Sequence, residues 1–294
     1  IAEGYVYTRE RSGYFASALP HLPGIAPASS STTHPAVDAA PDSDAAGAGA
    51  RNPEDARLAD PQIRIDLSRS TPPFNEQAFH LWAKAMRATI ASENPVEAFL
   101  GVPGIGTQRL REAIASHLAS FRGFSADPEC IVVGAGAQVL YGLMVQLLGR
   151  NRTYAVEDPG YPMLGKMYPA HGARVAYLPL DAEGISLPHL QKSDASVAHV
   201  MPSHQFPTGI VTSIARRYEL LAWAAEQPGR YLVEDDYDCE FRLAGKPIPP
   251  LASIDAAQKV IYMNTFSRTL SASMRVAYLV LPPHLMEQIG RAHV

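Results

Sequence analysis

Short apolar segments alternate with helical patterns from about residue 62 onward, and this alternation constrains the fold more than any other feature. The runs that read as strands are CIVVGA, YAVED, VAYLPL, VAHVMP, YLVEDDY, VIYMNTF and VAYLVLP. Helical spacing of apolar residues appears between several of them, as in QVLYGLMVQLLG and IARRYELLAWAAEQ. Strands that alternate with helices predict an α/β fold with a mostly parallel sheet that has helices on both faces.

The composition excludes several classes of protein. The chain has 294 residues, of which 47% are hydrophobic and 18% charged, as in ordinary globular proteins. A formal net charge of -4 argues against a chain that binds polyanions over its whole surface. The two cysteines, Cys130 and Cys239, lack metal-ligand spacing, so we expect no metal site and no disulfide framework. No apolar run approaches the roughly 20 residues that span a bilayer, and we expect a cytoplasmic protein without a membrane segment.

The sequence before residue 62 divides into two parts. The segment AEGYVYTRERSGYF predicts a β-hairpin with strands at Tyr5–Arg9 and Tyr14–Ala16, within a first unit at 1–20. Residues 21–61 are rich in Ala, Pro, Ser, Asp and Gly, which predicts a flexible linker; the alternative is a long surface loop of the main domain. Residues 62–294 then form the α/β domain.

Two of the predicted strand ends are suited to an anion. Such ends are where ligands bind in sheets of this class. The segment VVGAGAQVL passes from a strand into a helix that begins at about Gln138, so free backbone N–H groups would face an anion there, although a tight turn explains the glycines equally well. The segment TFSRTLSASMR supplies hydroxyls and cations for a phosphate. The candidate phosphate residues are Gly136, Ala137, Gln138, Thr265, Ser267, Arg268 and Arg275.

Other strand ends carry aromatic and acidic side chains. Tyr161 follows the turn in VEDPGYP and could lie over a flat ligand, although a tyrosine there is more often part of the core. Asp235 in VEDDYD falls on the same face as Tyr237, and a carboxylate at a strand end usually marks a site. PSHQFPTG adds His204 and Gln205. A phosphate cradle, a stacking aromatic ring and a carboxylate for a ring nitrogen together describe a pocket for pyridoxal 5'-phosphate.

The order of these motifs resembles a known family. The domain is similar to a fold-type I aminotransferase. More narrowly, AEGYVYTRERSGYF, RLREAIASHL, VEDPGYP, PSHQFPTG, EDDYDCEFR and TFSRTL with MRVAYLVLP resemble the MocR subfamily of GntR-type transcriptional regulators. Those proteins join a winged-helix DNA-binding domain through a linker to an aminotransferase-like domain that senses the cofactor or an amine. The resemblance implies that residues 1–20 are the wing of a winged helix, and that the chain is truncated at both ends, without the small C-terminal domain.

The resemblance also implies roles for single residues. Tyr161 would stack on the pyridine ring, Asp235 would pair with the ring nitrogen, and Tyr237 would reach the phenolic oxygen. Either His204 or Gln205 would stand for the Asn of the Asn-Pro-Thr-Gly segment of aminotransferases. The phosphate would be held by Gly136, Ala137, Gln138, Thr265 and Arg275. Arg9 and Arg11 of the wing would lie near DNA, and the domain would act as a homodimer.

Arg268 departs from the family pattern. It stands where the family has the lysine that forms a Schiff base with the cofactor, and a guanidinium stays protonated and cannot attack an aldehyde. We therefore expect non-covalent cofactor binding and transaminase activity that is lost or very low. Two explanations stay open, a natural regulator without the covalent link, and a single-base error in the sequence or drift in a decaying gene. The leading function is a fragment of a cofactor-responsive or amine-responsive transcriptional regulator; the alternatives are a metabolic class I/II aminotransferase and a catalytically inactive binding or dimerisation module.

Overall fold

The computed structural model describes residues 6–9, 13–16, 76–92, 104–241, 248–270 and 272–292. It divides into two compact units, Ile1–Arg64 and Ile65–Val294.

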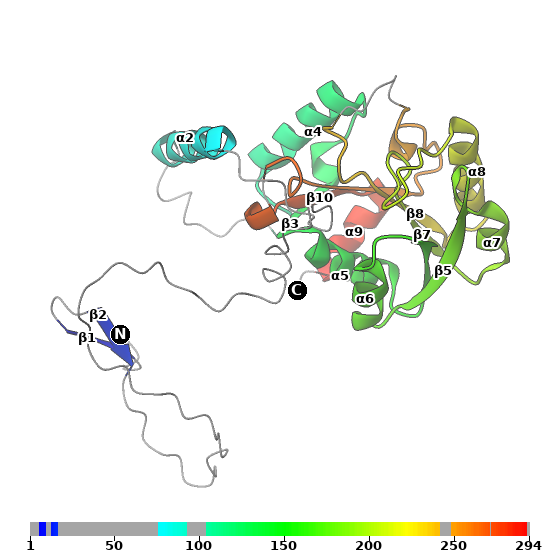
Figure 1. Ribbon diagram of the computed structural model, residues 1–294, viewed down its shortest axis with the longest axis horizontal. Helices are drawn as coiled ribbons and strands as arrows, with labels where there is room; N and C mark the ends of the chain where they lie inside the picture. The colour runs from blue at the N-terminus through cyan, green and yellow to red at the C-terminus, as the bar shows by residue number, and fades with distance from the viewer. Residues whose placement is uncertain are drawn as a thin grey trace, which may run out of the picture. The chain divides into compact units, whose positions relative to one another are not determined.

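The described part of the first unit is a two-stranded antiparallel ribbon. Strand β1 (Val6–Arg9) pairs with β2 (Gly13–Ala16), with Val6 opposite Ala16 and Arg9 opposite Gly13 (Figure 1). Both strands lie where the sequence predicts them. Arg9 ends β1, whereas Arg11 and the predicted linker 21–61 lie outside the described residues. The assignment of this ribbon as a wing stays a prediction.

A mixed sheet forms the centre of the second unit. Its strands are β3 (Ile131–Gly134), β4 (Thr153–Asp158), β5 (Arg174–Asp181), β6 (Gly184–Ile185), β7 (Val197–Val200), β8 (Tyr231–Asp235), β9 (Val260–Thr265) and β10 (Ala277–Val280). Their order within this eight-stranded sheet is β3-β10-β9-β8-β7-β4-β5-β6. Within the described residues, β6 and β10 pair antiparallel with their neighbours and the other pairs are parallel. The predicted, mostly parallel α/β sheet is confirmed.

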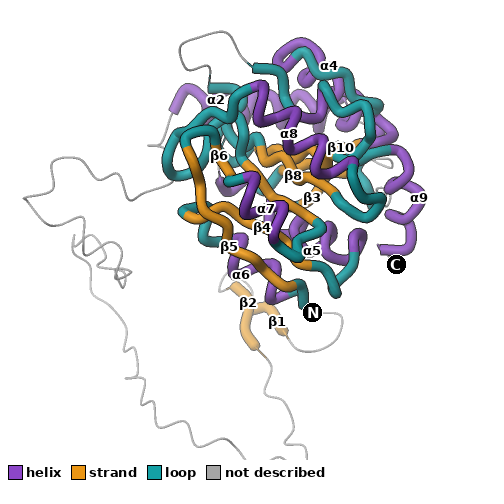
Figure 2. The backbone as a smooth tube through the Cα atoms, turned by 90° about the vertical axis from the view of Figure 1, so that its right-hand side faces the viewer, coloured by secondary structure: helices purple, strands orange, loops and turns teal. Residues whose placement is uncertain are grey.

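Helices cover both faces of this sheet. The described helices are α2 (Glu76–Ser92), α4 (Gln108–Arg122), α5 (Ala137–Leu148), α6 (Leu164–Ala170), α7 (Leu187–Lys192), α8 (Ile214–Ala225) and α9 (Pro283–Ala292), with 3₁₀ turns at Pro128–Cys130, Leu251–Ser253 and Ala272–Met274. Helices α5, α6 and α9 pack on one face, and α4, α7 and α8 on the other, with the strands between them (Figure 2). Among the described helices, we find none whose length and hydropathy would let it cross a membrane.

Local sequence signals set the ends of the helix that precedes the sheet. The hydroxyl of Thr107 accepts a hydrogen bond from the backbone N–H of Leu110 at 3.3 Å and caps the start of α4. Gly123, with φ +63°, ends the helix in the left-handed conformation, as the sequence predicts. Between these ends Leu118 is fully buried, which contributes about 1.5–3 kcal/mol.

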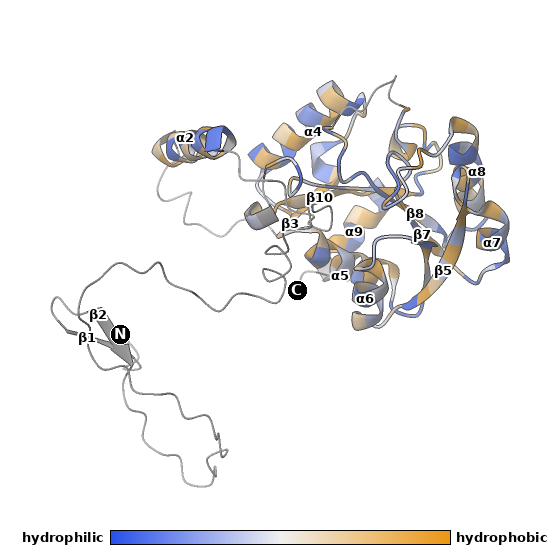
Figure 3. Cartoon of the chain, in the orientation of Figure 1, coloured by the Kyte–Doolittle hydropathy of each residue, from blue (hydrophilic) through white to orange (hydrophobic). Residues whose placement is uncertain are grey.

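The distribution of hydropathy follows from the layers. The sheet strands are mainly apolar because both of their faces are covered, whereas α4 and α8 carry apolar and polar residues on opposite sides (Figure 3). The polar residues that interrupt the strands are therefore informative. Glu157, His199 and Asp235 are all buried in strands β4, β7 and β8.

Candidate functional site

A cavity of about 320 Å³ lies at the carboxyl ends of β8 and β9, beside the beginning of α5. This volume falls within the range of ligand sites, which is about 300–1,000 Å³. The lining residues are Ala137, Gln138, Tyr141, Tyr161, Met201, Phe206, Asp235, Tyr237, Thr265, Ser267, Arg268 and Arg275. Nine of these twelve residues are candidates from the sequence, and the structure brings them together from four of the segments described above.

One end of the cavity combines a helix N-terminus with a cation. Gly136 precedes α5 with φ +95°, and a Cβ atom at this position would lie 2.4 Å from Nη2 of Arg275. Only glycine therefore allows the guanidinium to approach the first turn of α5 so closely. The unpaired N–H groups of that turn and the cation both favour an anion.

Hydroxyl groups lie in the adjoining turn. The Oγ1 atom of Thr265 is 2.9 Å from Oγ of Ser267 and also accepts from the Ser267 backbone N–H at 3.2 Å. This local hydrogen-bonded turn follows β9 and leads to Arg268, which also lines the cavity. The turn places two hydroxyls and a cation on the cavity wall, as the sequence predicts.

Asp235 lies at the end of β8, where its carboxylate is held from behind. It is 4% exposed and accepts from the hydroxyl of Tyr141 at 3.5 Å. Its Oδ2 also lies 3.3 Å from Nε2 of His199, whose Nδ1 is 2.7 Å from the hydroxyl of Tyr168. The tautomer of His199 with its proton on Nε2 is consistent with both contacts, because it accepts from Tyr168 and donates to Asp235. Asp235 thus stays fixed while it faces the cavity.

Aromatic rings form another wall of the cavity. Tyr161, 38% exposed, packs edge to face against Phe206 with ring centroids 6.0 Å apart. Burial raises the pKa of Tyr161 and Asp235 raises it further, while the guanidinium groups of Arg268 and Arg275 act in the opposite direction. Both of these arginines line the same cavity as Tyr161.

The structure does not bring His204 and Gln205 to the cavity wall. Nδ1 of His204 lies 2.5 Å from Oδ2 of Asp238, and Gln205 is 1% exposed. The amide nitrogen of Gln205 donates to Oε2 of Glu157 at 3.1 Å and to the carbonyl of Pro159 at 3.0 Å. Gln205 thus joins the loop after β4 to the loop after β7 and supports the cavity from outside.

Phe206 lines the cavity in their place and was missed by sequence reasoning. It directly precedes Pro207-Thr208-Gly209 and so stands in register with the Asn of Asn-Pro-Thr-Gly. That register is a signal in the sequence that could have identified it. Tyr141 and Met201 were also missed, because a residue within an apolar helix or strand run looks like core.

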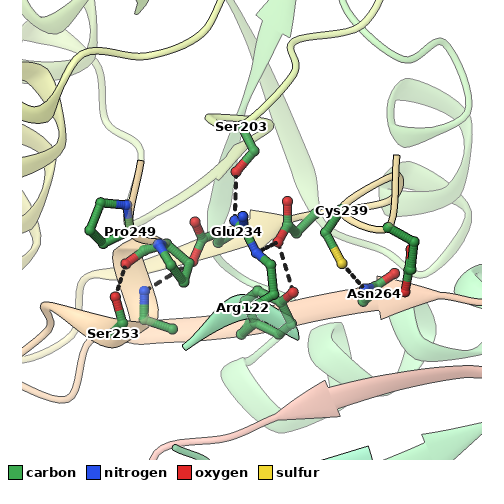
Figure 4. A network of polar contacts seen from close by, with 12 residues as sticks. Arg122, Ser203, Glu234, Cys239, Pro249, Ser253 and Asn264 are labelled. Atoms are coloured by element: carbon green, nitrogen blue, oxygen red, sulfur yellow. Dashed lines mark hydrogen bonds and ion pairs between the residues drawn. The ribbon is translucent and has the colours of Figure 1, made fainter. Parts of the chain in front are cut away.

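Side chains on the opposite face of β8 form a buried ionic network. Glu234 and Asp236 alternate with Asp235 and point away from the cavity. Nε of Arg122 lies 2.8 Å from Oδ2 of Asp236, and Nη1 of Arg217 lies 3.5 Å from Oε1 of Glu234. Figure 4 shows Arg122 and Glu234 within this network of polar contacts. Glu234 also accepts from the backbone N–H groups that begin the 3₁₀ turn at Leu251–Ser253. This network anchors the strand end without contributing to the cavity.

Comparisons with known proteins agree with this fold and these motifs. The chain is 33% identical over 289 residues to a protein named as an uncharacterized HTH-type transcriptional regulator, YdeL, of Bacillus subtilis, covering 98% of this chain and 57% of the relative. It is 31% identical to the probable rhizopine catabolism regulatory protein MocR of Rhizobium meliloti, and the match covers 99% of this chain and 57% of that protein. The resemblance to MocR-type regulators is thus confirmed, and the chain spans little more than half the length of these relatives.

A solved structure and a family sequence pattern both relate this chain to aminotransferases. The kynurenine aminotransferase of Pyrococcus horikoshii superposes with a TM-score of 0.69 at 25% identity, over 82% of this chain and 61% of that protein. The sequence pattern of the family described as aminotransferase class I and II matches residues 62–293. The chain therefore belongs to the aminotransferase class I and II family.

Proposed function

We propose that this chain is the cofactor-sensing part of a DNA-binding transcriptional regulator, and that its cavity binds pyridoxal 5'-phosphate without a covalent bond. The observation that carries the proposal is the convergence of Asp235, Tyr161 and Arg275 on one cavity in which Arg268 replaces a lysine. The fold of the aminotransferase class I and II family implies this cofactor. The similarity to regulators over nearly the whole chain favours sensing over metabolism.

The residues present fit the cofactor. Gly136 leaves space for the guanidinium of Arg275 beside the N–H groups of Ala137 and Gln138, which would hold the phosphate. Thr265 and Ser267 would add hydroxyl contacts. A buried carboxylate is costly unless it is paired, and Asp235, which faces the cavity, would gain a partner in a protonated ring nitrogen.

The remaining contacts orient the ring. Tyr161 would stack on its face, and Tyr237 would reach the phenolic oxygen. His199 holds the Asp235 carboxylate in place from behind, so that the carboxylate need not reorganise when the ring binds. When bound, the cofactor supplies an electron-accepting ring and an aldehyde that reacts with amines.

Covalent attachment is not expected in this chain. The lysines in the sequence are Lys84, Lys166, Lys192, Lys246 and Lys259, and none of them is among the residues that line the described cavity. Arg268 cannot act as a nucleophile or as a general base, because its guanidinium does not lose its proton. Transaminase activity would therefore be absent or very low.

The relatives support a proposal for the rest of the regulator. We propose that residues 1–20 are the end of a winged helix, in which Arg9 and Arg11 approach DNA, and that 21–61 is a linker to the domain at 62–294. The effector is the cofactor or an amine that reacts with it. The domain would act as a homodimer, as the resemblance implies.

A visible absorbance titration with pyridoxal 5'-phosphate tests the proposal. We expect the natural chain to bind the cofactor without a band of a Schiff base and without an adduct that borohydride can trap. The Arg268→Lys variant should show both. If neither protein binds the cofactor, the roles of Asp235, Tyr161 and Arg275 are wrong. If the natural chain forms a trappable adduct, another amine is the nucleophile.

A further inference from the structure

A histidine and a carboxylate contact Tyr237 from outside the cavity. The ring of Tyr237 lies nearly parallel to the imidazole of His204, with an interplanar angle of 16° and centroids 6.3 Å apart. Its hydroxyl lies 3.5 Å from Nδ1 of His204, and the same nitrogen lies 2.5 Å from Oδ2 of Asp238. Tyr237 lines the cavity, whereas His204 and Asp238 are not among the lining residues. This pair of residues thus contacts the cavity wall without reaching the cavity itself.

The contact between His204 and Asp238 fixes the use of the Nδ1 atom. Two lone pairs repel each other at hydrogen-bond distance, so a proton lies between Nδ1 and Oδ2. A carboxylate only accepts, and the N–H group of His204 therefore donates to Asp238. The Nδ1 atom then has no lone pair in the ring plane for a second donor. The hydroxyl of Tyr237 consequently cannot donate its proton to this nitrogen.

The hydroxyl of Tyr237 keeps its proton and has a competing acceptor beside it. Burial raises the pKa of Tyr237, and the charge of Asp238 and a hydrogen bond to this carboxylate raise it further, while Arg268 acts in the opposite direction. An Asp238 without another donor would hold the phenolic proton and turn it away from a ligand. The N–H group of His204 supplies that other donor. It therefore leaves the hydroxyl of Tyr237 available to the cavity.

We propose that His204 and Asp238 are positioning residues that keep the hydroxyl of Tyr237 available as a hydrogen-bond donor to a ligand in the cavity. This inference rests on the proposed function, in which Tyr237 reaches the phenolic oxygen of pyridoxal 5'-phosphate. The N–H group of His204, rather than its ring, sets the strength of that contact. His204 thus affects the affinity for the cofactor without touching it.

Two substitutions of His204 separate its N–H group from its ring. His204→Phe keeps a ring that can stack on Tyr237 but removes the donor to Asp238. His204→Asn removes the ring but keeps an amide N–H group at the same distance along the side chain. Absorbance titration of the whole chain with pyridoxal 5'-phosphate should show about tenfold weaker binding by His204→Phe, and binding within about threefold of the natural chain by His204→Asn. Equal affinities of the two variants, or the reverse order, overturn the inference and leave the proposed function intact.

A double-mutant cycle tests whether the effect passes through the hydroxyl of Tyr237. Tyr237→Phe alone should weaken binding of pyridoxal 5'-phosphate. Adding His204→Phe to Tyr237→Phe should then change the affinity by less than about twofold, because the hydroxyl on which His204 acts is absent. A further loss of about tenfold in the double variant indicates a general disturbance of the loop and refutes the positioning role. An unchanged affinity of Tyr237→Phe alone refutes it as well.

The chain contains a matched pair for the control. His284 also stacks on a tyrosine, Tyr231, and its Nε2 lies 3.0 Å from the hydroxyl of that tyrosine. Neither residue lines the described cavity. His284→Phe should therefore bind pyridoxal 5'-phosphate as the natural chain does, and a loss equal to that of His204→Phe contradicts the inference. If the natural chain itself does not bind pyridoxal 5'-phosphate, the proposed function fails.

Discussion

Glu157 gives the stability of the fold a pH dependence of predictable sign. Its carboxyl group is 6% exposed at the end of β4 and accepts from the Gln205 amide at 3.1 Å. Burial raises its pKa from 4.5 to about 7, against the opposing effect of the hydrogen bonds from Gln205 and from the backbone of Met201. Between these two values the folded chain holds a proton that the unfolded chain releases. Folding stability therefore falls as the pH rises through this interval.

The size of the effect follows from the difference between the two pKa values. Each unit corresponds to about 1.4 kcal/mol, so complete ionisation of Glu157 costs the fold up to about 3 kcal/mol. The Glu157→Gln variant keeps an oxygen that accepts from Gln205 but does not titrate. Relative to the natural chain, this variant should gain up to about 3 kcal/mol between about pH 5 and about pH 8.

Urea unfolding across this pH range measures the difference. Trp223 is 1% exposed, so its fluorescence should report the loss of the core. A variant of Glu234 should be measured alongside, because burial also raises the pKa of Glu234 to about 7 and this group therefore titrates in the same pH range. If Glu157→Gln follows the natural chain at every pH, Glu157 is already ionised in the folded protein and the reasoning is wrong.

Three further predictions concern the cavity and its supports. Gly136→Ala should destabilise the fold by about 1–3 kcal/mol, because φ is +95°, and should weaken cofactor binding by displacing Arg275; unchanged affinity in a cofactor titration refutes this. His199→Phe should remove the ring nitrogen that lies 3.3 Å from Oδ2 of Asp235, and should weaken cofactor binding by about tenfold; a cofactor affinity within twofold of that of the natural chain refutes this. Arg122→Met should cost about 3–5 kcal/mol in urea unfolding, because its buried aspartate partner at 2.8 Å stays charged or must take up a proton; a cost below about 1 kcal/mol contradicts this.

The sequence predicts the layers of this fold better than its details. Residues 154–156 and 260–263, within strands Thr153–Asp158 and Val260–Thr265, are apolar on both faces, and those short runs identify the strands. The two-residue strand Gly184–Ile185 was missed, because so short a segment has no period to detect.

Side-chain contacts between distant strands are what the sequence could not supply. Asp235 was predicted from its place at a strand end, but His199 lies within an apolar run and gave no signal. Their meeting depends on the parallel pairing of β7 and β8, in which His199 lies opposite Val233. Register of this kind is set by tertiary packing.

The alternation of acids along β8 bears on how such a protein can change over evolutionary time. The residues that shape the strand end, Glu234 and Asp236, are paired with Arg217 and Arg122 on the face away from the cavity. Arg268, in contrast, lines the cavity and takes no part in these two ion pairs. On the proposed function, a single codon at position 268 separates a covalent cofactor site from a non-covalent one, and the rest of the strand end stays the same.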